Sequence, residues 1–302
     1  MRGLVFRRRT ANVLILLASC GRVRFEPAPI DASDVDGSSG ADAYVCDPAL
    51  PFGAPVPIRE INMPQVGEGT FRTTPDELGG YFWSYRGGAG SQAKIYYASR
   101  PDLATPWTVQ TTTGLEDGRN DLDPTLASDG SVFVFRKNSP DDLYVATPID
   151  ATTFQTPMPI ASINTLSTET EPFLQPNGNE LIFNSMRTGG GDLYRSTRTG
   201  TSFSAPTLIS ELSTLADEGD PVLGADGLTL YFRRNDGATD YDIFVATRTS
   251  TAQPFGVGQL VENVNAVGPA EGPSAVSEDG CRLYLTSDRS GDYDIYVATR
   301  GL

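Results

Sequence analysis

Asp220-Pro221-Val222-Leu223 opens the phrase that decides the fold of this chain. The turn pair Asp226-Gly227 follows, then the apolar run 228–232, and then the segment 242–246, which reads Asp-Ile-Phe-Val-Ala. Glycine accepts the positive φ that a tight hairpin turn requires. The phrase therefore predicts an inner strand, a hairpin turn, a second strand and a third strand.

The same phrase recurs about every fifty residues, over 123–146, 171–196, 220–246 and 272–298, with a weaker copy over about 68–98. The aligned aromatic residues are spaced 48, 50, 50 and 52 residues apart, and they are Tyr96, Tyr144, Tyr194, Phe244 and Tyr296. A long period with short strands is typical of a β-propeller, in which each repeat forms one four-stranded blade. We therefore predict an all-β, five-bladed β-propeller of antiparallel blades over residues 51–302.

A shorter phrase that suits a fourth, outer strand has one copy before the first inner strand. Its five copies lie at 51–58, 106–109, 154–160, 203–209 and 255–260, and none follows the last third strand. We expect 51–58 to supply the outer strand of the last blade, which would close the ring and cover a sheet edge. Prolines in these phrases suit an edge strand, where a missing N–H costs no ladder bond.

Ring closure makes a prediction about two of the three cysteines. Cys46 precedes the closing strand, and Cys281 begins the second strand of the blade that this strand joins. These two strands run parallel with one strand between them, so both cysteines emerge at the same face. Because an exported protein can keep disulfides, we predict a Cys46–Cys281 bridge, the alternative being two free thiols.

The N-terminus has the layout of a secretory signal peptide. Residues 1–9 are basic, residues 13–17 are apolar and too few to cross a bilayer, and Leu17-Ala18-Ser19-Cys20 follows. These last four residues resemble the lipobox of bacterial lipoproteins. The resemblance implies removal of residues 1–19, acylation of Cys20 with chains such as palmitate, and, with Gly21 next, transport to the outer membrane. The alternative is an ordinary signal peptide with a cysteine there by chance.

Residues 20–50 are predicted to form a lipidated, flexible, acidic linker, because they contain too few large apolar groups to support a core. The membrane would then be contacted only through the lipid.

Composition excludes several functions. The net charge of −15 argues against nucleic acid as a partner, which would require a basic face. The chain has no histidine, which excludes histidine triads and histidine metal ligands. We therefore assign no catalytic residue, no cofactor and no metal ligand, and we expect a monomer.

Acidic residues just before the inner strands should gather near one mouth of the central channel. They are Glu68, Asp121, Asp123, Glu169, Glu171, Asp217, Asp220 and Glu271. Such a group can bind a cation or a basic group of a ligand. The simpler interpretation is that the recurring arginines Arg86, Arg187 and Arg289 neutralise it.

Aromatic residues in or beside the first repeat depart from the pattern of the others. Trp83, Tyr85 and Trp107 would suggest recognition of a sugar or a protein if they were exposed together. Packing between blades is the simpler interpretation.

The segment 287–296, preceded by Pro273 and Glu278-Asp279-Gly280, resembles the WD-like propeller repeat of the TolB type. The resemblance covers about residues 51–302 and implies an envelope protein that binds other proteins. Our hypothesis is a non-catalytic envelope lipoprotein whose propeller is an interaction platform for an envelope protein or a glycan. The alternative is a glycosidase that uses a carboxylate pair, or a glycan-binding module.

These two hypotheses differ in what they require of the carboxylates. Unpaired carboxylates in a deep pocket lined by Trp83 or Trp107 would favour the enzyme. Carboxylates paired with arginine around a narrow channel would favour the platform.

Overall fold

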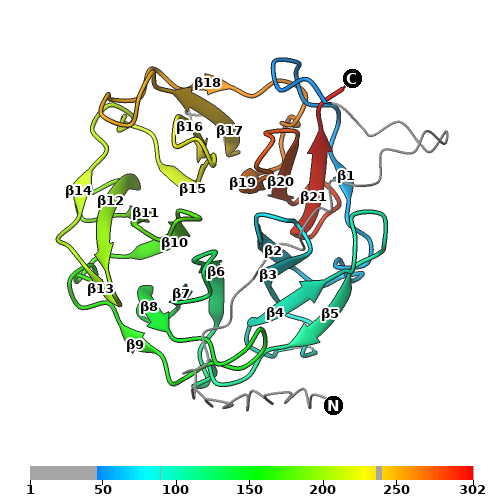
Figure 1. The fold of residues 1–302 in the computed structure, drawn as a ribbon, viewed down its shortest axis with the longest axis vertical. Coiled ribbons are helices and arrows are strands. Elements are labelled where there is room, and N and C mark those ends of the chain that lie inside the picture. The colour runs from blue at the N-terminus through cyan, green and yellow to red at the C-terminus, as the bar shows by residue number, and fades with distance from the viewer. Residues whose placement is uncertain (1–45, 89, 236–239, 302) are drawn as a thin grey trace, which may run out of the picture.

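The computed structural model describes residues 46–88, 90–235 and 240–301, and these form a five-bladed β-propeller (Figure 1). Five antiparallel sheets surround a central channel, as the repeat predicts. The described residues contain no helix, and hence none that is long and apolar enough to cross a membrane.

The blades follow one another along the chain, and each runs from an inner strand at the channel to an outer strand at the rim. Blade I contains β2 (Glu68–Thr73), β3 (Gly79–Ser84), β4 (Lys94–Ser99) and β5 (Thr108–Thr111). Blade II contains β6 (Asp121–Leu126), β7 (Phe133–Lys137), β8 (Asp142–Ala146) and β9 (Met158–Pro159). Blade III contains β10 (Glu169–Leu174), β11 (Glu180–Ser185), β12 (Asp192–Thr199) and β14 (Thr207–Leu208), with a short additional strand β13 (Ser202–Phe203) paired to β12. Blade IV contains β15 (Glu218–Leu223), β16 (Thr229–Arg234), β17 (Asp242–Thr247) and β18 (Gln259–Leu260). Blade V contains β19 (Glu271–Val276), β20 (Arg282–Ser287), β21 (Asp294–Thr299) and β1 (Val56–Pro57).

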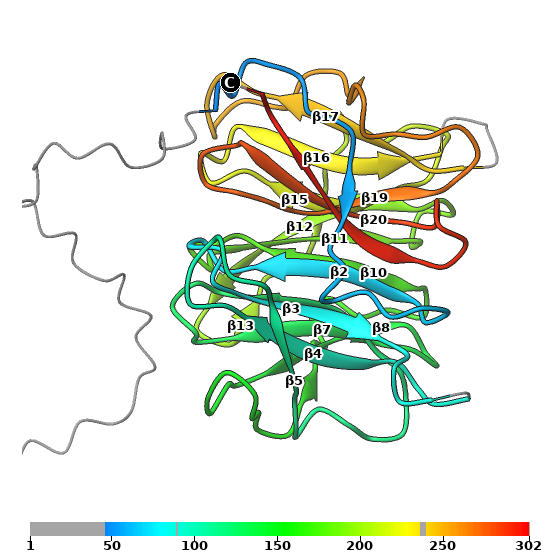
Figure 2. The same cartoon turned by 90° about the vertical axis from the view of Figure 1, so that its right-hand side faces the viewer.

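The N-terminal strand closes the ring, as expected. β1 lies beside β21 and pairs with it antiparallel, Val56 facing Val297 (Figure 2). The guanidinium of Arg300 lies 3.9 Å from the ring centre of the buried Phe52. Arginines at the ends of β4 and β17 lie in the same way over Trp107 and Phe255. The segment around Phe52 therefore occupies the place of a fourth strand in blade V.

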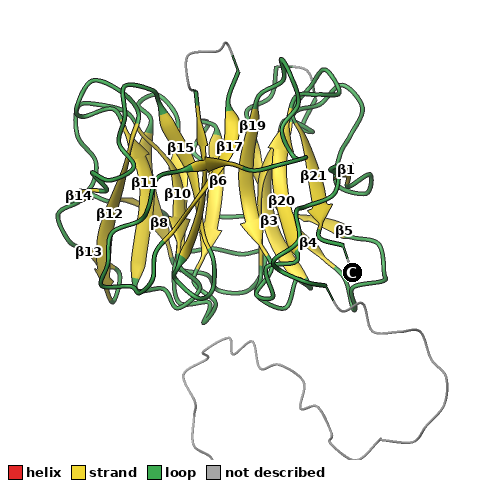
Figure 3. Ribbon diagram, turned by 90° about the horizontal axis from the view of Figure 1, so that it is seen from above, coloured by secondary structure: helices red, strands yellow, loops and turns green. Residues whose placement is uncertain are grey.

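The strands run between two loop-covered faces (Figure 3). We call the face where the inner strands begin the mouth face. It also holds the loops that join the second strands to the third. We call the opposite face, which holds the turns between inner and second strands, the hairpin face. At the mouth face the first residue of each inner strand donates its N–H to the preceding blade, as Glu68 does to the carbonyl of Tyr293 at 2.7 Å.

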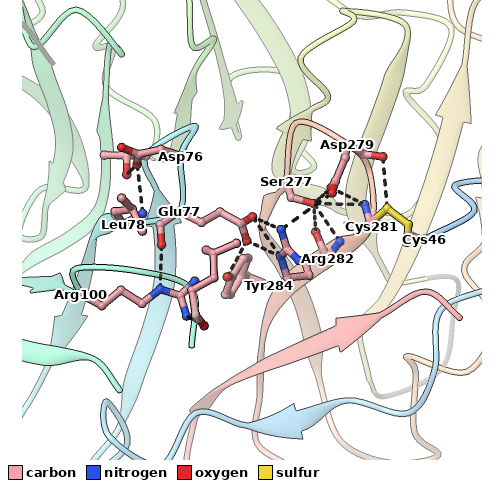
Figure 4. Close-up of polar contacts among 12 residues, drawn as sticks. Cys46, Asp76, Glu77, Leu78, Arg100, Ser277, Asp279, Cys281, Arg282 and Tyr284 are labelled. Carbon is pink, nitrogen blue, oxygen red and sulfur yellow. Dashed lines mark hydrogen bonds and ion pairs between the residues drawn. A yellow bond between two sulfur atoms is a disulfide. The ribbon is translucent and has the colours of Figure 1, made fainter. Parts of the chain in front are cut away.

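Two contacts fasten the closure of the ring at the hairpin face, one within blade V and one between blades V and I (Figure 4). Cys46 and Cys281, the pair proposed from the sequence, form a disulfide with a Cα–Cα distance of 6.0 Å. Glu77 of blade I accepts hydrogen bonds from Nε and Nη2 of Arg282 and from the Tyr284 hydroxyl, the last at 2.7 Å, and both donors belong to blade V. Closure thus combines strand pairing, a covalent bond and a buried ion pair.

Candidate functional site

Except for Asp217, the acidic residues predicted at the channel mouth lie within the inner strands, not before them, and together with Glu218 they form two sets. The first set occupies the first residue of every inner strand, and it comprises Glu68, Asp121, Glu169, Glu218 and Glu271. All five are buried. Each pairs with a cation that lies at or just beyond the end of its own blade's second strand, and these cations are Arg86, Lys137, Arg187, Arg234 and Arg289. Because every blade repeats this pair, the first set is architectural.

Burial raises the pKa of four members of this first set. It raises the pKa of Glu68, Glu218 and Glu271 above the ordinary value, although hydroxyl groups and arginines oppose the shift. Burial also raises the pKa of Asp121 to about 6, against the opposing effect of Lys137.

Blade IV requires a correction. The predicted Asp217 lies one residue before the strand and accepts a bond from the Gly191 N–H at 2.8 Å. Glu218, which the sequence reasoning missed, holds the repeated position and pairs with Arg234 at 2.9 Å. Two acids are adjacent in this repeat, so its alignment with the other repeats is ambiguous. Glu169 lies two residues before Glu171 in blade III, and the same spacing before Asp220 selects Glu218.

The second set is Asp123, Glu171 and Asp220, the third residues of the inner strands in blades II, III and IV. A β-bulge interrupts each strand at this point and gives these residues φ values of 51°, 56° and 45°. Bulges re-aim side chains, and Thr70 of blade I has the same bulge with φ of 50°, so this conformation belongs to the repeat. These three carboxylates meet at the channel mouth, whereas the first set points into the blades.

Two arginines form ion pairs with the carboxylates of the second set. Arg136 Nε lies 2.8 Å from Asp123, whose other oxygen accepts from the Thr70 hydroxyl at 3.0 Å. Arg233 lies between Glu171 at 2.5 Å and Asp220 at 3.2 Å, so one guanidinium serves two carboxylates. Glu171 also accepts the backbone N–H of Asp220 at 2.8 Å.

The sharing of one guanidinium has an electrostatic consequence. Burial, reinforced by the neighbouring Glu171 carboxylate, raises the pKa of Asp220 to about 7. Chemically, the mouth can hold one proton near neutral pH, but each of its carboxylates already has an arginine partner.

Arg72 crosses the channel below these carboxylates. It donates to the carbonyl oxygen of Ser274 in blade V and to that of Pro172 in blade III, and its guanidinium lies 5.0 Å from the ring centre of Phe173. Burial lowers the pKa of Arg72 to about 10. Among the described residues no carboxylate forms an ion pair with it, and its Nε has no hydrogen-bond partner.

The predicted aromatic surface is only partly present. Trp83 is half-buried and donates to the Thr70 hydroxyl at 3.2 Å, and the exposed Tyr85 contacts it edge-on. Trp107 is wrong as a surface residue, because it is 8% exposed and packs against Phe71 in the core of blade I. Its position in an outer-strand phrase, where other blades carry phenylalanine, accounts for this burial.

Exposed apolar side chains surround the mouth. Leu166, Leu215 and Val267 occupy corresponding loop positions in blades III, IV and V, and all three are fully exposed. Other exposed large apolar residues on loops of the mouth face are Met63, Tyr85, Met186 and Tyr293. Sequence reasoning did not find this set, because an apolar residue in a loop has the same appearance whether it is buried or exposed.

The remaining features considered from the sequence are the lipidation site and metal ligands. Cys20, the expected lipidation site, lies outside the described residues. Within the described ranges no group of three or more acidic, cysteine or histidine residues is placed to hold a metal ion.

The comparisons with known proteins provide information about the fold alone. No protein-family model matches the chain, and no curated protein matches it. Among solved structures, TolB from Acinetobacter baumannii aligns at 17% identity and a TM-score of 0.48, over 78% of this chain and 55% of TolB, so the chain spans about half of TolB's length.

Two sugar-cleaving enzymes also share the fold. A thermostable family-43 glycoside hydrolase aligns at 12% identity and a TM-score of 0.54, over 78% of this chain and 89% of that one. The α-L-arabinofuranosidase PaAbf62A from Podospora anserina, solved in complex with cellotriose, aligns at 11% identity and a TM-score of 0.51, over 85% and 98%. At such identities these likenesses establish a propeller architecture and leave function open.

Proposed function

We propose that this chain is an envelope lipoprotein whose mouth face binds another protein. The observation that carries the proposal is the set of exposed apolar side chains around a mouth whose charges are already paired. Leu166, Leu215 and Val267 project fully into solvent from three consecutive blades. Grouped exposed apolar residues mark interaction surfaces, and interfaces are enriched in methionine and tyrosine, which Met186 and Tyr293 supply here.

The arginine pairing of the mouth supports a platform more than an enzyme. Hydrolysis of a glycoside needs one carboxylic acid and one free carboxylate facing the substrate. Here Arg136 holds Asp123, and Arg233 holds both Glu171 and Asp220. The raised pKa of Asp220 favours the glycosidase alternative, because a general acid must stay protonated near neutral pH.

The attachment of the N-terminal segment fits the same proposal. Cys46 is bonded to Cys281 at the hairpin face, opposite the mouth. A linker from a lipidated Cys20 would therefore reach the propeller at the hairpin face and leave the mouth face directed away from the membrane.

The test is capture of envelope proteins by the full chain and by two matched variants. Replacement of Leu166, Leu215 and Val267 together by serine should abolish capture of the specific partner. Replacement of Leu103 and Ile149 by serine should leave it unchanged, because these exposed residues lie in loops of the hairpin face. Equal capture by both variants would contradict the proposal, and so would aryl-glycoside hydrolysis that Asp220→Asn abolishes. Release of Cys20→Ser into the soluble fraction would test the anchor separately.

A further inference from the structure

A small cavity opens on the hairpin face at the centre of the ring. It has a volume of about 70 Å³. Its wall is built from the last residues of successive inner strands, Leu126, Leu174, Leu223 and Val276, together with Phe173. Residues of the hairpin turns form its rim, among them Thr74, Ser128 and the exposed acid Glu278. The cavity is thus a narrow, mainly aliphatic site with polar groups at its entrance.

Arg72 also lines this cavity, and the packing of apolar side chains does not account for a charged residue at this position. At the corresponding position the other inner strands carry Thr125, Phe173, Val222 and Ala275, none of them charged. Arg72 is 5% exposed, yet its two hydrogen bonds go to neutral backbone carbonyls and its Nε has no partner. A guanidinium has five N–H donors, and burying it without an anion is costly.

The nearby carboxylates attract Arg72 through space, but among the described residues none of them forms an ion pair or hydrogen bond with it, and its Nε stays without a partner. Asp123, Glu171 and Asp220 lie on the mouth side, where they form their ion pairs with Arg136 and Arg233. The hairpin-face cavity therefore combines an under-coordinated buried cation with aliphatic walls.

We propose that this cavity binds a short aliphatic carboxylate whose anionic end accepts hydrogen bonds from Arg72. The aliphatic part would lie against Leu126, Leu174, Leu223 and Val276. Cavities of roughly 150 Å³ accept benzene, so this cavity of about 70 Å³ encloses only the carboxylate and the first carbons of a short chain, and the rest of the chain would lie in its opening between the hairpin turns. Arginine binds carboxylates through two parallel N–H bonds, and Arg72 has donors free for this purpose.

A free branched-chain acid and the C-terminal residue of a peptide share this chemistry. A free branched-chain acid would fill the cavity and end in its opening at the rim. A peptide ending in valine would place the same groups inside and leave through the rim between Thr74 and Ser128.

Titration calorimetry on the purified full chain tests the proposal with 3-methylbutanoate as the probe and 3-methylbutanamide as its neutral counterpart. The acid should bind at least roughly tenfold more tightly than the amide, because the amide lacks the charge that Arg72 recognises. Gly-Gly-Val with a free or an amidated C-terminus distinguishes the two sources. Tighter binding of the free-terminus peptide than of the acid indicates a peptide ligand, and the reverse indicates a free acid.

Two variants address the site itself. Arg72→Met keeps the length of the side chain, and an apolar replacement of a buried charge is often tolerated, so the variant should fold and lose binding. Ala225→Trp, at an exposed rim position, should block entry while leaving Arg72 in place. Arg195→Met, an exposed arginine on β12, is the matched control and should bind normally.

Equal binding of acid and amide, or full binding by folded Arg72→Met, would overturn the proposal. If Arg72→Met does not fold, full binding of the acid by Ala225→Trp would overturn the proposal instead. The serine variant of the mouth face should bind the acid normally, so this result stands or falls independently of the proposed interaction platform.

Discussion

Glu77 occupies a turn position that is glycine in the four other blades. The corresponding residues, Gly130, Gly178, Gly227 and Gly280, have φ between 67° and 72°, and Glu77 adopts φ of 55°. A side chain in this conformation costs about 1 kcal/mol or more. The gain that offsets this cost is the contact of its carboxylate with Arg282 and Tyr284 across the seam.

We predict that Glu77→Gly destabilises the protein by about 1–2 kcal/mol. The glycine relieves backbone strain, but it leaves Arg282 and the buried Tyr284 hydroxyl without their acceptor. Urea unfolding of the variant measures the loss. Glu77→Gln keeps the side chain and removes only the charge, so it should be intermediate. Unchanged or increased stability of Glu77→Gly would show that the seam contact contributes little.

Single residues also mark the limit of what the sequence predicts at the site. The repeat places Glu169 and Glu171 at the same channel mouth, but a bulge between Thr170 and Phe173 separates their environments. Side chains alternate between the faces of a strand, so one extra residue redirects those that follow. Sequence alone does not locate such a bulge, although Arg72 is detectable as the one charged residue at its repeat position.

At the scale of elements, the outer strands differ most from expectation. The phrases predicted strands of about four to eight residues, whereas β1, β9, β14 and β18 each contain 2 residues. Proline is the physical reason in two of them, because Pro57 and Pro159 donate no backbone hydrogen bond. Buried aromatic residues such as Phe52 and Phe255 hold these segments in place instead. Inner, second and third strands follow the repeat, since their apolar runs have no other place to pack.

We predict that Phe52→Ala destabilises the protein by about 3–4 kcal/mol, although Phe52 lies outside any strand. Its ring is buried against Tyr231 of blade IV and under Arg300. Thermal unfolding and hydrogen exchange measure the effect, and exchange in β21 should increase first.

Val56→Ala is the matched control for this prediction. Val56 pairs within β1 but is 60% exposed, so its truncation should change stability by at most about 0.5 kcal/mol. Equal effects of the two substitutions would mean that strand pairing, not the aromatic anchor, closes blade V.

At the scale of the whole molecule, the ring is a closed structure whose two ends meet in blade V. The Cys46–Cys281 bond spans 235 residues, and disulfides that close long loops typically stabilise by about 2–4 kcal/mol. The repeat predicted five blades, and the displaced copy of the outer-strand phrase at 51–58 predicted the closure, because the last blade otherwise lacks a fourth strand. The exposed apolar set and the unpaired donor of Arg72 depend on the assembled ring, and so they required the structure.

Stability of the whole ring should depend on pH in an unusual direction. Folding raises the pKa of Asp220 to about 7, and it also raises the pKa values of the buried Glu68, Glu218 and Glu271. The folded state then binds protons more tightly than the unfolded chain, whose aspartates titrate near 3.9. Linkage requires the free energy of unfolding to fall as pH rises from about 4 to about 7.

We therefore predict that the melting temperature is highest near pH 4–5 and is lower at pH 8, and that Asp220→Asn flattens this decline. If the substitution reduces the pH-dependent loss of unfolding free energy by about 1 kcal/mol, the corresponding difference in melting temperature is about 2–4 °C for a domain of this size. Asp117→Asn is the control: hydrogen bonds from Arg119 lower the pKa of Asp117 to about 2, so its contribution is complete above pH 4 and its loss should leave the decline unchanged. A melting temperature that rises between pH 4 and pH 7 would mean that Arg233 keeps Asp220 ionised, which would contradict the raised pKa of this carboxyl.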